Sequence, residues 1–158
     1  MRDLRFVAAH RGGPLEIAQH RLLSVWAADC AQHVLTHFES CSADAQPRCA
    51  IELARAWARG EISVGDAQKA AVAAHAAARA VMSQSASATA AARAAGHAVA
   101  TAHMADHCLG AAWYALKSVA AAGAAANLER SWQIEQIPDA LRELVVSALD
   151  NRLPSCYT

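Results

Sequence analysis

The sequence predicts an all-α fold: one domain, residues 1–158, in which five to seven helices form a bundle around an alanine-rich central pair. Three observations predict it. About a quarter of the residues are alanine, the strongest helix former. Aromatic residues make up only 5%, and β-branched residues are also scarce. Apolar positions recur at helical spacing. Residues 1–13 end in two glycines and are expected to form a flexible N-terminal arm.

The first helix is expected over residues 14–39, because proline is well suited to the first turn of a helix. Within it, four residues spaced four, three and four apart lie on one face: Trp26, Cys30, His33 and His37. A polar loop follows at residues 40–47. The second helix begins near Arg48 and ends at Gly60, a typical C-terminal residue.

Ser63 is expected to cap a third helix, with Asp66 three residues later. Its apolar face is made mostly of alanine, which lets helices approach closely, so this helix is expected to be central. Ser85 or Ser87 then begins a long alanine-rich run that reaches residue 122. Gly96 and Gly110 lie within this run. We expect them either to bend it or to serve a packing need, because glycine costs roughly 1 kcal/mol in a helix.

Two shorter helices complete the bundle. One follows Gly123 and Asn127 and contains Trp132, and the last begins at Pro138 and is stopped by Pro154. Five cysteines, Cys156 among them, form no CxxC pair, which is typical of reduced thiols in the cytoplasm.

Histidine spacing suggests one chemical alternative. On a straight helix His103 and His107 lie about 40° apart, a spacing that lets two imidazoles bind one divalent transition metal. His33 and His37 repeat the spacing, and the two pairs facing each other would form a four-imidazole site. His97 is rotated about 120° from His103 and would not join them. The competing interpretation, which we favour, is that these histidines are hydrogen-bonded within the core and that the protein holds no metal or cofactor.

Charge and composition disfavour several function classes. Lysine plus arginine and aspartate plus glutamate number 14 each, so no net positive field attracts nucleic acid or an anionic membrane. No stretch of about 20 residues is continuously apolar, and the N-terminus is too charged for a signal peptide, so we expect a cytoplasmic protein. No nucleophile has a base at a characteristic spacing, and no catalytic residue is predicted.

Protein binding is the function class that these observations leave open. Trp57, with Arg55, Arg59 and Glu61 beside it, combines residue types that anchor protein interfaces. The alternative is a core tryptophan beneath a charged surface. Alanine-rich faces would also permit a structural scaffold or a homo-oligomer.

Five segments taken in order carry a family resemblance: HRLLSVWAADCAQHVL, RAWARGEI, AHAAAR, AGHAVATAHMADH and ERSWQIEQIPDALRELV. They span residues 20–145. The chain resembles a family of small bacterial all-helical immunity proteins, similar to the fifth immunity class of polymorphic toxin systems. The resemblance implies a non-enzymatic protein that binds and neutralises a cognate protein toxin.

Overall fold

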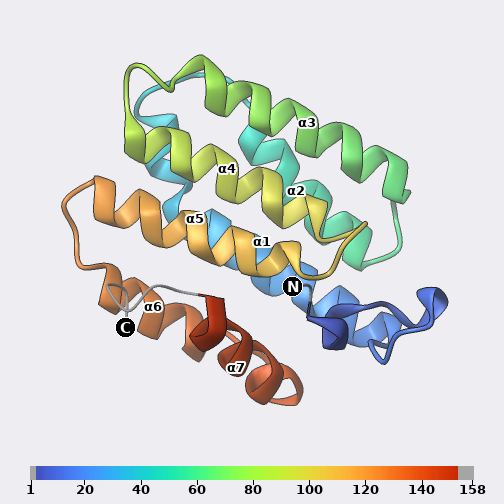
Figure 1. The fold of residues 1–158 in the computed structure, drawn as a ribbon. Helices are drawn as coiled ribbons and strands as arrows, with labels where there is room; N and C mark the ends of the chain where they lie inside the picture. The colour runs from blue at the N-terminus through green and yellow to red at the C-terminus, as the bar shows by residue number, and fades with distance from the viewer. Residues whose placement is uncertain (1–2, 153–158) are drawn as a thin grey trace.

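The computed structural model describes residues 3–152, and within them the regular structure is entirely helical, which confirms the predicted all-α class. Seven α-helices are accompanied by three short 3-10 turns (Figure 1). The helices are α1 (Ile17–Glu39), α2 (Gln46–Ala58), α3 (Val64–Ala80), α4 (Ala86–Ala100), α5 (His107–Ala121), α6 (Ala126–Glu135) and α7 (Arg142–Arg152). None of the described helices is long and apolar enough to cross a membrane.

Helices α1 to α5 form two layers. Helices α3, α4 and α5 lie side by side in one layer, and α2 and α1 form the layer behind them (Figure 1). Helix α4 is central, because it packs against α1, α2, α3 and α5. We expected α3 to be central as well, but it closes one edge of its layer. Its inner alanines, such as Ala74, are fully buried, while Val72 on its outer side is 67% exposed.

Local signals fix three helix ends as predicted. The Ser63 hydroxyl accepts a hydrogen bond from the Asp66 amide at 3.1 Å, and Ser85 does the same for Ala88 at 3.0 Å. Both are N-caps, which satisfy backbone donors that the first helical turn leaves unpaired. Gly60 follows α2 with a φ of +78°, a conformation that costs glycine little.

We predicted one long helix for the alanine-rich run, but the run forms two helices. It breaks at residues 101–106, and α4 and α5 fold back against each other as a hairpin (Figure 1). A single helix from Ala86 to residue 122 would be about 55 Å long and would extend well beyond a domain of this size. The hairpin instead buries the alanine faces of both halves against one another and against α1.

The described part of the expected N-terminal arm is folded. Residues 3–13 form two 3-10 turns and place Phe6 in the core with no exposed surface. The Leu15 amide donates to the Val7 carbonyl at 3.0 Å. This pairing keeps residues 14–16 out of the first helix, so α1 begins at Ile17 instead of the predicted Pro14.

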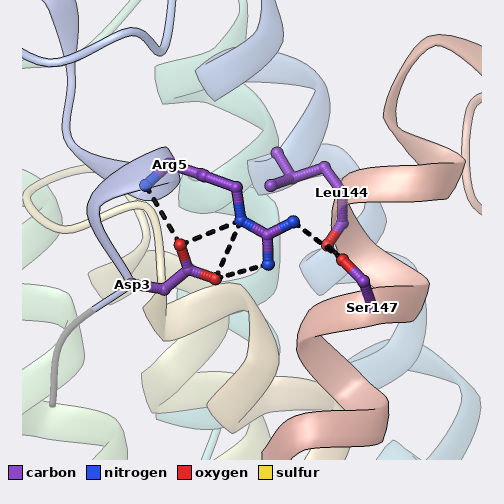
Figure 2. Close-up of polar contacts among 4 residues, drawn as sticks. All are labelled: Asp3, Arg5, Leu144 and Ser147. Atoms are coloured by element: carbon purple, nitrogen blue, oxygen red, sulfur yellow. Dashed lines mark hydrogen bonds and ion pairs between the residues drawn. The ribbon is translucent and has the colours of Figure 1, made fainter.

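The N-terminal turn also holds the C-terminal helix. Figure 2 shows Arg5 between two partners: its guanidinium pairs with Asp3 at 2.7 Å and donates to the Ser147 hydroxyl of α7 at 2.8 Å. Ser147 in turn donates to the Leu144 carbonyl at 3.1 Å. The predicted stop at Pro154 and the thiol of Cys156 lie outside the described residues.

Candidate functional site

Trp57, the predicted interface anchor, lies on the inner side of α2. Its side chain is only 8% exposed, and its ring contacts the His20 ring at a centroid distance of 4.8 Å. The bulk of the indole therefore belongs to the core, in agreement with the alternative interpretation of the sequence. One part of it nevertheless reaches a surface hollow.

This hollow, which we call the Trp57 hollow, has a volume of about 310 Å³. It is bordered by the N-terminal turn, the start of α1, the α2–α3 loop and the segment after α4. Its rim is apolar in two places, where Ile17 is 50% exposed and Val64 39% exposed. The lining residues are His10, Arg11, Ile17, His20, Arg21, Trp57, Gly60, Ile62, Val64, Ala102 and His103.

Two cations of the Trp57 hollow are free to meet a partner. Arg11 and Arg21 are exposed, and neither forms an ion pair within residues 3–152. Arg59 lies just outside and is already paired with Glu61, through contacts of 2.7 and 2.8 Å. Their hydrogen bond lowers the pKa of Glu61 and raises that of Arg59, so both stay charged and largely cancel each other. The hollow itself is left positive.

Two imidazoles, those of His20 and His103, are among the side chains that line the Trp57 hollow. His20 is 2% exposed, and its Nε2–H donates to the Thr101 carbonyl at 2.5 Å. Burial lowers the pKa of His20, and the hydrogen bond to Thr101 opposes that shift only in part, so the ring is neutral at pH 7. The Nδ1 atoms of His20 and His103 have no hydrogen-bond partner among residues 3–152.

Arg55, the remaining predicted interaction residue, lies in a different place. It pairs with Asp29 at 2.8 Å and lines a second, shallow hollow of about 450 Å³ between α1, α2 and α6. There Trp132 stacks on His33 at 3.7 Å, and His33 contacts the buried Glu129 at 2.6 Å. The four residues predicted as one patch are therefore divided between two surfaces, with Trp57, Arg59 and Glu61 at the first.

The two predicted histidine pairs do not face each other. His33 and His37 are engaged by Glu129 and Ser118, with Nδ1 distances of 2.6 and 2.8 Å. His103 and His107 lie instead at the corner where α4 turns into α5. Within residues 3–152, no three or more histidine, cysteine, aspartate or glutamate side chains are arranged to hold a metal ion. The four-imidazole site considered from the sequence is therefore not formed.

The α4–α5 hairpin brings together histidines that a straight helix would separate. Nδ1 of His97 lies 3.2 Å from Nδ1 of His107, and His107 and His103 have ring centroids 4.9 Å apart. His75 of α3 approaches His97 at 5.3 Å. We call these four side chains the histidine row. The expectation that His97 would stay apart from the pair was wrong, because it assumed an unbroken helix.

Sequence reasoning missed the arginines of the Trp57 hollow. Arg11 and Arg21 precede Trp57 by more than 30 positions and belong to other elements, so only the folded chain brings them together. The available signal was that Arg11 adjoins Gly12 and Gly13, where a turn was expected to redirect the chain.

Comparison with known families gives one result that covers most of the chain. A family model described as Imm-5 like putative immunity protein matches residues 13–140. This range contains α1 to α6 and nine of the eleven residues that line the Trp57 hollow; His10 and Arg11 precede it. The comparison with curated proteins and the comparison with solved structures each give no match.

Proposed function

Because the chain belongs to the Imm-5 like putative immunity protein family, we propose that it neutralises a cognate protein toxin by binding it, without catalysing a reaction. The Trp57 hollow is the surface feature that best supports this proposal, and we infer that the toxin binds there. It combines an indole floor, an apolar rim and two arginines that form no ion pair with any residue in the range 3–152. Exposed apolar surface beside unpaired charge is a common property of protein interfaces.

The chemistry of the hollow defines the partner's contact segment. A segment with an apolar side chain would bury it against Ile17, Val64 and Trp57. Neighbouring carboxylates would pair with Arg11 and Arg21, and arginine forms such pairs with favourable bidentate geometry. The expected contact is therefore an acidic stretch of the toxin carrying at least one large apolar residue.

The hollow is the centre of the proposed interface, because a stable complex buries roughly 800 Å² on each partner. Arg59 and Glu61 lie beside Gly60 at the edge of the hollow and would form part of the surrounding rim. Arg55 and Trp132 face the second hollow and are outside this proposed interface. Such binding would take place in the cytoplasm, where we expect the protein to reside.

A non-enzymatic role agrees with the state of the core thiols. Cys30, Cys41 and Cys49 are free thiols. Burial raises the pKa of the Cys30 thiol well above its usual value, so the thiol stays protonated and is a poor nucleophile. Cys108 is also fully buried.

Co-expression tests the proposal. The chain is produced together with the candidate toxin encoded by the adjacent gene, and survival of the host is measured. The double variant Arg11→Glu, Arg21→Glu reverses the charges of both arginines of the hollow, while Lys69→Glu makes the same kind of change on α3, where the side chain is 85% exposed. We expect protection by the wild type and by Lys69→Glu, and a loss of toxin affinity of at least about tenfold in the double variant.

The two parts of the proposal fail separately. If the host dies equally with and without the wild-type chain, the immunity role is wrong. If the double variant protects as well as the wild type and binds the toxin equally tightly, the role stands but the Trp57 hollow is not the interface.

A further inference from the structure

The histidine row is independent of the proposed toxin interface in one important respect: its closest pair touches neither the floor nor the arginines of the Trp57 hollow. Half of the eight histidines gather in it, in the order His75, His97, His107 and His103. Successive ring centroids are 5.3, 5.3 and 4.9 Å apart. The shortest nitrogen distance is the 3.2 Å between Nδ1 of His97 and Nδ1 of His107.

The backbone provides space for these rings. A Cβ on Gly110 would lie 2.6 Å from Nδ1 of His97, and a Cβ on Gly96 would lie 2.7 Å from the His75 ring. Only glycine permits these positions, although it lowers helix stability at both. On its other side, the His97 ring stacks against Tyr114 at 5.1 Å with an interplanar angle of 22°. The orientation of His97 is therefore set by α5 as well as by its own helix.

Three rings of the row, those of His75, His97 and His103, are neutral at physiological pH because folding lowers their pKa values. Burial lowers the pKa of His97 to about 4, with further contributions from His107, His75 and Arg93. Burial is also the main cause of the lowered pKa values of His75 and His103. A neutral imidazole presents a nitrogen lone pair, which is the form that binds metals.

The spacing of the closest pair suits a metal ion. Two nitrogens bound to one tetrahedral Zn²⁺ at about 2.0–2.1 Å lie about 3.3 Å apart, close to the separation found here. A shallow hollow of about 420 Å³ opens beside the pair and is lined by His75, His103 and His107. Water and small ions can therefore reach His107 and two neighbouring rings of the row from the surface between α3 and the α4–α5 corner.

We propose that His97 and His107 form a two-imidazole site for a divalent transition metal, bound through the two Nδ1 atoms. Because the described residues hold no preformed set of three ligands, water completes the coordination. Imidazole nitrogens favour Zn²⁺, Ni²⁺ and Cu²⁺, and Cu²⁺ binds most tightly of the three. In a neutral ring whose Nδ1 carries the shared proton, that proton is replaced by one on Nε2 when metal binds, and this change of tautomer releases no net proton.

Metal titration of the untagged full chain tests the site, because the chain contains its own control. His97→Gln with His107→Gln removes the proposed ligands, and His33→Gln with His37→Gln removes two histidines outside the histidine row. We expect the wild type to bind one equivalent of Cu²⁺ or Zn²⁺. Loss of a residue that only supports a metal ligand lowers metal affinity roughly 10- to 100-fold. The His97, His107 double variant should lose more than that, and the metal affinity of the His33, His37 double variant should stay within about twofold of the wild type.

A measurement on the wild type avoids dependence on folding of the variants. Imidazole nitrogen NMR with Zn²⁺ should move the Nδ1 resonances of His97 and His107 and leave those of His33 and His37 in place. The proposal is overturned by an absence of stoichiometric binding, by equal affinity of wild type and the His97, His107 variant, or by nitrogen shifts confined to other histidines.

Discussion

Replacing Gly110 by alanine should destabilise this protein, although the same change stabilises an ordinary helix. The new Cβ would lie 2.6 Å from Nδ1 and 2.9 Å from Cγ of the His97 ring, so the ring must move. Overpacking of this kind costs about 1–3 kcal/mol, and loss of the His97–His107 hydrogen bond costs about 1 kcal/mol more. The gain in helix propensity returns roughly 1 kcal/mol. The expected net loss in the free energy of unfolding is about 1–3 kcal/mol.

Urea unfolding followed by circular dichroism measures the change, and a thermal scan should show a midpoint lowered by roughly 2–4 °C per kcal/mol for a chain of this length. The decisive control is the same glycine replacement in a His97→Ala background. There the methyl group meets no ring, and the replacement should become neutral or stabilising. If Gly110→Ala stabilises the wild type, or if its effect is the same in both backgrounds, then the ring does not occupy the space above Gly110.

Three further outcomes follow from the structure. Stability should fall as pH drops from about 6.5 to about 4, because folding lowers the pKa values of His75, His97 and His103 and the unfolded chain therefore binds more protons in that window. Urea unfolding midpoints measured across this pH range should show the fall, and His97→Gln should make it less steep. A wild-type midpoint that does not change with pH would contradict the prediction. Trp57→Ala should cost about 3–5 kcal/mol in urea unfolding, since the side chain is 92% buried and packs on the core; a change under about 1 kcal/mol would mean that the indole is not part of the core. Ser85→Ala should lower the free energy of unfolding by about 1 kcal/mol, again measured by urea unfolding, because α4 loses its N-cap. An unchanged free energy of unfolding would mean that the Ser85 hydroxyl is not needed to cap the helix.

The ends of several helices could be predicted from the sequence because their causes are local. Ser63 and Ser85 accept backbone hydrogen bonds within three residues, and Gly60 adopts a left-handed conformation directly after α2. Each signal acts over one turn of chain, so no knowledge of distant residues is needed. The family resemblance likewise depended on segments that can be recognised one at a time, and the match over residues 13–140 confirms it.

The turn between α4 and α5 could not be predicted in the same way. Residues 101–106 contain neither glycine nor proline, and every described non-glycine residue keeps a negative φ. The chain reverses because burial of two alanine faces against α1 outweighs continuation of one helix, which is a tertiary effect. The length of the run was the one available warning. This single turn decides which histidines meet, so the error in the helix became an error in the candidate site.

The contact between Arg5 and Ser147 has a consequence for the order in which the protein is built. The two residues are 142 positions apart, and at about 5–20 residues per second a ribosome needs roughly 7–28 s to add the second after the first. The Trp57 hollow, by contrast, draws on residues 10–103 only. Its parts are all synthesised before the C-terminal helix that anchors the N-terminal turn exists. The nascent chain therefore carries every residue of its proposed binding surface well before its two ends are joined.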